Sequence, residues 1–281
     1  MGIIKEICDV IRQKNKKHII RFEHVIKNNH ELDFLFNNFE TYEKEVHGIK
    51  RKFLKGVNAD PGVTEQTLYL LCKEFPDNRG NVKVLNIGCG RKEQMSYLEK
   101  LGFDGYGVDY DIESDSEKVK YHDLNDTCDL PFEDVKFDCV ICQEVIEHIE
   151  NPWLLLRKIN KVIKKDAILI LTTPNISSIA GRKIFSKSDQ GFFLYFNENN
   201  LWQHINPMPY WLMIHVAGYN GFELKKLSGN DEFYFEYIAH GDEDYQKRVT
   251  IQNNYVLHYV FRSVDNAIKL YSPEPTYNHV W

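Results

Sequence analysis

Apolar and polar positions alternate between two periods along the central part of the chain. Short apolar runs of strand length are followed by segments with apolar residues at helical spacing. Strands are predicted at residues 82–87, 106–109, 118–122, 137–143 and 167–172. Helices are predicted at residues 64–75, 93–101 and 152–163, the last with Asn151 as its N-cap. Strands that alternate with helices predict an α/β fold with a doubly wound, mostly parallel sheet.

The two ends of the chain are less regular. Apolar residues recur at helical spacing in residues 1–60, which predicts an N-terminal helical extension or lid. Aromatic residues are frequent in residues 176–206, and this loop-like stretch suggests a lid over a ligand: Phe185, Phe192, Phe193, Tyr195, Phe196 and Trp202. A helix at 210–217 and strands at 222–227 and 233–238 follow. We therefore expect a ligand-binding domain at 61–240 and a C-terminal extension at 241–281, which the pattern does not place.

Composition narrows the class of protein. The chain has 281 residues, of which 43% are hydrophobic and 27% charged, as in a soluble globular protein. A net charge of −6 gives no support to nonspecific binding of nucleic acid. There is no signal peptide and no apolar run near the ~20 residues that span a bilayer, so a cytoplasmic location is expected. Cys139 and Cys142 fall on one predicted strand, where residues three apart face opposite sides, so a shared metal is not expected.

Candidate chemistry begins at residues 82–109. This stretch consists of a strand, the turn Gly88-Cys89-Gly90, a helix, and a strand that ends in Asp109. Asp109 lies about 20 residues beyond the turn, at the offset of a ribose-binding acid. The third glycine of a dinucleotide turn is missing, and Glu93 would oppose a phosphate in the first turn of the helix. The pattern therefore favours a nucleoside ligand without phosphates.

Five segments together resemble the class I S-adenosylmethionine-dependent methyltransferases. They are VLNIGCG, GYGVDYD, YHDLND, LPFEDVKFDCVICQEVIEHIENP and AILILTTPN, within a resemblance that covers roughly residues 64–230. The resemblance implies a Rossmann-like, seven-stranded sheet with helices on both faces. It implies S-adenosylmethionine as cofactor and S-adenosylhomocysteine as product. Within the superfamily, the chain resembles the branch associated with glycan and small-metabolite synthesis.

The resemblance also assigns roles to residues. Asn86, Gly88, Cys89 and Gly90 match the turn around the methionine part of the cofactor. Asp109 matches the acid that binds the ribose hydroxyls. Tyr110 matches the residue that packs on the adenine, and Asp123, with Leu124 beside it, matches the acid that reads the adenine amino group. Gln143 and Glu144 match the residues that border the methyl-transfer channel. One departure is Asn86, where members commonly carry Asp or Glu, so weaker cofactor binding or compensation elsewhere is expected.

Two histidines are candidates for the catalytic base. His204 follows the aromatic stretch, where the resemblance places the mouth of the substrate pocket, and His148 is the second choice. For Glu147 and His148, a structural role in the turn before Asn151 competes with catalysis. Asp and His residues at metal-binding spacing do not stand out in the sequence, which predicts a metal-independent enzyme.

These observations favour methylation of a small molecule, with an oxygen of a sugar or glycan precursor as the first choice. Methylation of nitrogen or carbon on a lipid or quinone-type acceptor is an alternative. The third hypothesis is a noncatalytic binding protein that kept the fold, and the residues that motivate it are Asn86 and Lys92. The expected partner is a small-molecule acceptor, without nucleic acid or a membrane span. A homodimer is left open.

Overall fold

The computed structural model describes most of the chain between residues 24 and 265. The described residues are 24–26, 34, 36–46, 49–55, 59–90, 93–132, 134–189, 191, 193, 195–196, 204–230, 235–237 and 243–265. Within these residues, none of the helices is both long enough and apolar enough to cross a membrane.

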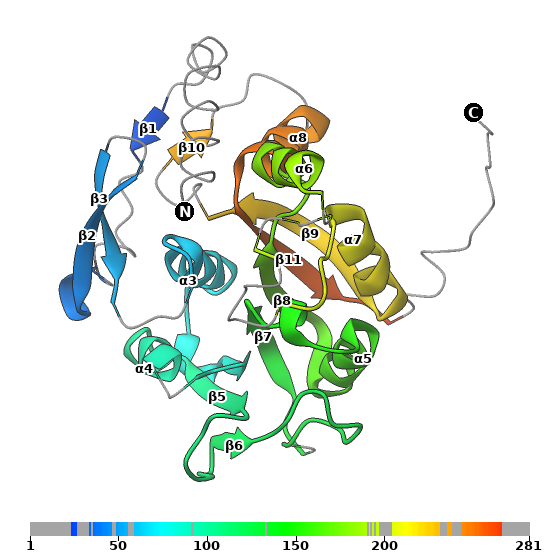
Figure 1. Cartoon of the computed structure of the whole chain (residues 1–281). Coiled ribbons are helices and arrows are strands. Elements are labelled where there is room, and N and C mark those ends of the chain that lie inside the picture. The colour runs from blue at the N-terminus through cyan, green and yellow to red at the C-terminus, as the bar shows by residue number, and fades with distance from the viewer. Residues whose placement is uncertain are drawn as a thin grey trace.

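A seven-stranded sheet forms the centre of the molecule (Figure 1). Its strands, in spatial order, are β6 (Val119–Tyr121), β5 (Asp104–Asp109), β4 (Lys83–Ile87), β7 (Phe137–Gln143), β8 (Ile163–Pro174), β11 (Val256–Ser263) and β9 (Phe222–Gly229). The first five strands run parallel, and β11 runs antiparallel to both of its neighbours. The expected mostly parallel, seven-stranded α/β sheet is therefore confirmed.

Helices cover both faces of this sheet (Figure 1). The helices α3 (Val63–Glu74) and α4 (Glu93–Lys100) pack on one face, and α5 (Pro152–Val162) and α7 (Tyr210–Tyr219) pack on the other. The side chains of β7 alternate between the two cores, so that Cys139 and Cys142 lie in different ones. Both thiols are buried, and the expectation that they do not share a metal agrees with this placement.

Local signals set the starts of two helices, and the one at Asn151 is as predicted. The Asn151 side chain accepts a hydrogen bond from the Leu154 N–H at 3.0 Å, and Pro152 occupies the first turn of α5. One further helix, α6 (Ile179–Lys187), lies in the stretch that was expected to be irregular. It begins at Ser178, whose side chain accepts from the Gly181 N–H.

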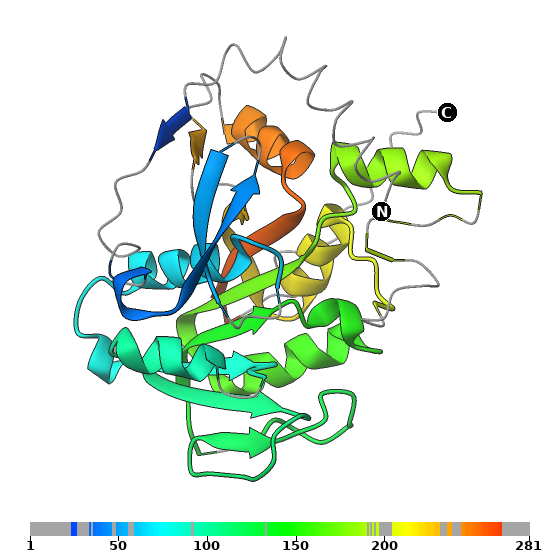
Figure 2. The same cartoon turned by 60° about the vertical axis from the view of Figure 1, so that its left-hand side comes forward.

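The N-terminal region is not purely helical, which corrects the expectation for residues 1–60. Strands β2 (Thr41–Val46) and β3 (Ile49–Leu54) form an antiparallel hairpin that packs near α3 (Figure 2). Its register places Glu43 opposite Lys52 and Glu45 opposite Lys50, and such pairs stabilise a two-stranded ribbon. The predicted helical residues before position 24 lie outside the described residues, and the role of this region as a lid stays a prediction.

The sheet also extends further along the chain than expected. The strand β11 lies inside residues 241–281, which the sequence pattern left as an extension, and it pairs with β8 and β9. The predicted strand at 233–238 does not enter this sheet. Instead, β10 (Phe235–Tyr237) pairs with β1 (His24–Ile26), apart from the central sheet. A helix, α8 (Glu243–Asn253), precedes β11. The domain that carries the site therefore includes residues up to Ser263.

Candidate functional site

The predicted cofactor residues lie at one edge of the sheet. Parallel pairing aligns the carboxyl ends of β4, β5, β6 and β7, which is the edge where open α/β sheets bind ligands. All ten predicted positions follow or end one of these strands: Asn86, Gly88, Cys89, Gly90, Asp109, Tyr110, Asp123, Leu124, Gln143 and Glu144.

The glycine turn after β4 needs its glycines. Gly88 has φ of 73° and Gly90 has φ of 59°, a left-handed region that side chains disfavour. A Cβ on Gly88 would also lie 2.3 Å from Cγ2 of Val145, which follows β7. The turn therefore passes close to the β7 end, and glycine at position 88 serves both the backbone angle and this close approach.

Replacing Gly88 by Ala tests this packing. We expect Gly88→Ala to lower the free energy of unfolding by roughly 2–4 kcal/mol, because backbone strain and a forced contact add. Urea unfolding measures it. Gly80→Ala is the matched control, since a Cβ at Gly80 would meet no atom closer than 3.9 Å. Equal stability of the two variants would contradict the close approach.

Asp109 joins the turn to the end of β5. Its side chain is 7% exposed. Oδ2 accepts a hydrogen bond from the Gly90 N–H at 2.8 Å, and Oδ1 accepts one from the Asp111 N–H at 2.8 Å. Both oxygens are thus held in place by backbone donors, and each has a lone pair left for a further donor. A diol is the kind of ligand that such a fixed carboxylate binds.

The predicted adenine residues lie on the open side of the edge. Tyr110 is 74% exposed, so its ring is available to a ligand. Asp123 is exposed and Leu124 is half-buried in the turn after β6. Oδ1 of Asp123 accepts from the Asn125 N–H at 2.9 Å, which orients the carboxylate. The role of these three residues in binding adenine stays a prediction.

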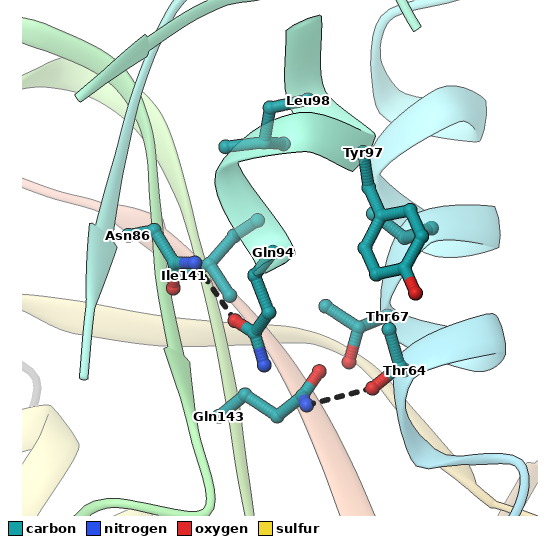
Figure 3. A pocket seen from close by; sticks show the side chains of 9 residues that line it. Thr64, Thr67, Asn86, Gln94, Tyr97, Leu98, Ile141 and Gln143 are labelled. Carbon is teal, nitrogen blue, oxygen red and sulfur yellow. Dashed lines mark hydrogen bonds between the residues drawn. The ribbon is translucent and has the colours of Figure 1, made fainter. Parts of the chain in front are cut away.

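Asn86 faces a small polar cavity between β4, β7, α3 and α4 (Figure 3). The Asn86 Nδ2 donates to Gln94 Oε1 at 2.7 Å, and the Gln143 Nε2 donates to Thr64 Oγ1 at 2.9 Å. Oδ1 of Asn86 and Oγ1 of Thr67 are buried without a hydrogen-bond partner among the described residues. The cavity measures about 10 Å³, which is close to the room that one water needs.

The lining of this cavity is relevant to Asn86, which stands where the methyltransferases that the chain resembles commonly carry Asp or Glu. Its polar lining consists of hydroxyls and amides, without a carboxylate. The Asn86 amide is oriented by Gln94, so its oxygen points to the cavity as an acceptor. An ammonium group or a water molecule would be a suitable donor there. Neutral hydroxyl and amide groups from α3 and α4 line this cavity, and whether cofactor binding is weakened at Asn86 or compensated elsewhere stays a prediction.

Glu144, the residue after β7, does not line this cavity and binds Thr172 of β8. It has φ of 50°, its N–H donates to Thr172 Oγ1 at 2.9 Å, and the Thr172 hydroxyl donates to Glu144 Oε1 at 2.7 Å. Burial raises the pKa of Glu144 to about 8, the Thr172 hydrogen bond opposes this, and the charge of Asp60 adds to it. Glu144 therefore carries a proton over much of the neutral range.

A second set of ionisable groups forms where the chain turns after β7. The N–H groups of Ile205 and Asn206 donate to the Glu147 carbonyl at 2.8 and 3.0 Å. This contact brings His204 next to His148, with ring centroids 4.6 Å apart. The ligand-type atoms of Glu147, His148 and His204 all lie within 4.8 Å of one another. The two candidate histidines are thus one cluster rather than alternatives.

Electrostatics separate the roles of the members of this cluster. Glu147 is fully buried, its Oε2 accepts from the Thr173 hydroxyl at 3.2 Å, and its Oε1 has no partner among the described residues. Burial raises the pKa of Glu147, and the charge of Glu144 adds to this. Burial and the neighbouring His148 lower the pKa of His204 to about 4, while a backbone hydrogen bond to Tyr195 opposes them. His204 is therefore neutral at pH 7, and its buried Nδ1 has no partner among the described residues.

The sequence profile of a family described as "Methyltransferase domain" matches residues 58–228. The chain belongs to this methyltransferase family. The methyltransferase assignment that the resemblance implied is therefore confirmed. The matched residues contain every predicted cofactor position and both histidines.

Similar proteins of this kind occur in bacteria and archaea. The chain is 23% identical over 164 residues to a "Ubiquinone biosynthesis O-methyltransferase" of Pelagibacter ubique (strain HTCC1062), covering 53% of this chain and 65% of that protein. It is 30% identical over 112 residues to the protein of the same name from Rickettsia bellii (strain OSU 85-389), covering 37% and 46%. The matches thus span less than two thirds of these relatives. A solved structure, "a SAM dependent methyltransferase from Archaeoglobus fulgidus", aligns with a TM-score of 0.45 at 18% identity, covering 71% of this chain and 94% of that one.

Two features of the methyltransferase site are not evident from the sequence. The turn before Asn151 suggests a structural role for Glu147, and its buried carboxyl lies beside the two histidines. Glu147, His148 and His204 could together hold a metal ion, although their spacing along the chain does not indicate such a set. The signal was weak because His204 is far from His148 in the chain. Metal independence itself stays a prediction.

The aromatic stretch of the methyltransferase partly borders this cluster. Phe196 lies 5.2 Å from His204 between ring centroids. The Tyr195 hydroxyl donates to Asp60 Oδ2 at 2.5 Å, which ties the stretch to the segment before α3. Phe185 stacks on Phe193 instead. Phe192 and Trp202 lie outside the described residues, and a lid role for the stretch stays a prediction. Asp60 is not among the site residues that the sequence predicts, because it stands in the helix-breaking Asp60-Pro61-Gly62 rather than in a cofactor motif.

Proposed function

We propose that this chain transfers the methyl group of S-adenosylmethionine to a hydroxyl oxygen of a small, uncharged acceptor, and that His204 accepts the hydroxyl proton. The observation that carries the proposal is the state of His204. It is a neutral, half-buried imidazole, and its Nδ1 atom is buried without a partner among the described residues. Such a group can take a proton from an acceptor at neutral pH.

Each neighbouring group supports this use of the cluster. The cofactor supplies a methyl group already activated by the sulfonium. The turn at Gly88–Gly90 and Asp109 would fix the cofactor, and the chain would then need only to align the acceptor oxygen with the methyl group. As the oxygen–carbon bond forms and the carbon–sulfur bond breaks, the hydroxyl proton moves to His204 Nδ1. The carboxyl of Glu147, close to both rings, would stabilise the imidazolium that results.

The charge of the surroundings favours an uncharged acceptor. Asp60, Glu144 and Glu147 are close enough that their charges act on one another. The sequence from Ser188 to Leu224, which contains His204 and the aromatic residues from 192 onward, has no Lys or Arg, whereas Arg182, Lys183 and Lys187 lie before it on α6. A phosphate or carboxylate on the acceptor would find no cation on this segment. This argues against phosphorylated sugar precursors.

Aromatic hydroxyls are our first choice of acceptor. The named relatives are O-methyltransferases of ubiquinone biosynthesis, and the aromatic ring of Phe196 lies beside His204. The sugar or glycan acceptor expected from the sequence finds no support among these relatives, whereas the quinone-type alternative does. Methylation of an amine is the second candidate, because the buried carboxyls would also suit a cationic acceptor.

A panel of acceptors tests the proposal. Methyl transfer from S-adenosylmethionine is followed by mass spectrometry with catechol, protocatechuate, dopamine and glucose. We expect catechol to be methylated at least tenfold faster than protocatechuate, which differs by one carboxylate. Faster methylation of the dopamine nitrogen would favour the second candidate. Calorimetry with S-adenosylhomocysteine provides the control, and absence of binding would exclude both enzymatic candidates and favour a noncatalytic protein.

A further inference from the structure

Lys158 is a buried lysine whose ammonium group binds backbone rather than a carboxylate. It lies on the inner face of α5 and is 1% exposed. Its Nζ donates to the Leu124 carbonyl at 3.3 Å and to the Asp126 carbonyl. A lysine is seldom buried unless its charge is compensated. Asp126 and Asp129 supply compensating charge, and they oppose the lowering of the Lys158 pKa by burial.

The two carbonyls belong to the turn that carries Asp123. The Asp126 N–H donates to the Asp123 carbonyl at 3.1 Å, which closes the turn. Inside it, the Asn125 N–H donates to Asp123 Oδ1 at 2.9 Å. A second contact reaches the turn from the chain before α5, where the Glu150 N–H donates to Asn125 Oδ1 at 2.9 Å. Lys158 and Asn125 thus attach this turn to α5 from two sides.

This arrangement leaves one atom of Asp123 available. Oδ1 is engaged inside the turn, and Oδ2 has no hydrogen-bond partner among the described residues. Asp123 is exposed and stands at the edge where the cofactor is proposed to bind. The direction in which Oδ2 points depends on the conformation of the turn, and Lys158 holds the two carbonyls that define this conformation.

We propose that Lys158 is a positioning residue for the adenine end of the cofactor. By holding the turn of residues 123–126, it directs Oδ2 of Asp123 toward the amino group of the adenine. The inference rests on the proposed cofactor role of Asp123. It adds a residue on the far side of the turn that does not itself touch the cofactor. Lys158 therefore contributes to recognition of the base, and the methyl-transfer step does not depend on it directly.

The test compares two ligands that differ at the adenine amino group. S-adenosylhomocysteine carries this group, and S-inosylhomocysteine carries an oxygen in its place. Calorimetry gives the ratio of their dissociation constants for the wild-type protein and for Lys158→Met, which keeps the length of the side chain and removes the donor. We expect the wild type to prefer the adenosyl ligand and Lys158→Met to lose about tenfold of this preference. Affinity for the inosyl ligand should change little.

Matched variants separate positioning from general stability. Lys161→Met lies one turn further along α5 and removes only a surface pair with Asp129, so the ligand preference should stay at the wild-type value. Asn125→Ala removes the second attachment of the turn at an exposed position and should reduce the preference in the same direction. It serves as the test if Lys158→Met does not fold. In an Asp123→Ala background, neither change should alter the ratio further.

The outcomes are distinct. A preference that stays unchanged in Lys158→Met and Asn125→Ala would overturn the inference, even if both variants melt at a lower temperature. Equal binding of both ligands by the wild-type protein would show that Asp123 does not recognise the adenine amino group. The inference on Lys158 would then fail, because it depends on this role of Asp123. Failure of the proposed hydroxyl methylation would leave the ratio unaffected, because the ratio concerns cofactor binding alone.

Discussion

Asp109→Ala should abolish most of the affinity for the cofactor. The Asp109 carboxylate accepts hydrogen bonds from the Gly90 and Asp111 N–H groups, and we assign its remaining lone pairs to the two ribose hydroxyls. Two charge-assisted hydrogen bonds to the ligand would be lost, and the hold on the glycine turn would be lost with them. We expect the dissociation constant of S-adenosylhomocysteine to rise by about 100-fold or more. Isothermal titration calorimetry measures it.

The control for this prediction lies two residues away. Asp111→Ala removes an exposed carboxylate and keeps the backbone N–H that donates to Asp109, so its affinity should stay near that of the wild type. Asp109→Asn is the finer probe. The Asn amide keeps one acceptor oxygen but places an NH2 donor where Asp109 has its second acceptor oxygen, next to the backbone N–H donors of the turn. We therefore expect an intermediate loss of affinity for the cofactor. Unchanged binding by Asp109→Ala would remove Asp109 from the cofactor site.

The cofactor edge of the fold could be predicted because its signals are local. A strand, a glycine turn and a helix follow one another within residues 82–100, and hydrophobic period and glycine position suffice to recognise them. The parallel order of strands then places Asp109, Asp123 and Gln143 at one edge. Neither step needs a long-range contact to be known in advance.

Other parts depended on contacts that the local pattern does not encode. The sequence pattern predicts helix where β2 and β3 form a hairpin, since strict alternation of apolar and polar residues is absent. The signal that indicates the hairpin is charge complementarity, as in Glu43 opposite Lys52. The strand β11 lies in the segment that the pattern does not place, and its pairing with β8 and β9 shows that it belongs to the sheet. The histidine cluster likewise forms through the contact of residues 205–206 with Glu147.

His204→Ala should lower turnover without a matching loss of cofactor binding. If Nδ1 accepts the proton of the acceptor hydroxyl, removing the imidazole should reduce kcat by about 10²–10⁴-fold. With His204 neutral above its pKa of about 4, the wild type should show no loss of activity from this group between about pH 6 and 9. The variant should become faster as pH rises across this range, because it must rely on acceptor already ionised in solution. Initial rates with catechol at several pH values measure both effects.

Two controls make the result specific to a proton acceptor. His215→Ala removes a histidine of α7 that packs against Trp153 and Tyr219, and its pH dependence should match the wild type. Dialysis against EDTA tests the metal-holding capacity of Glu147, His148 and His204. Full activity after dialysis would agree with proton transfer to His204, whereas activity lost and then restored by a divalent cation would assign the cluster to metal binding. Unchanged turnover of His204→Ala across the pH range would remove His204 from the mechanism.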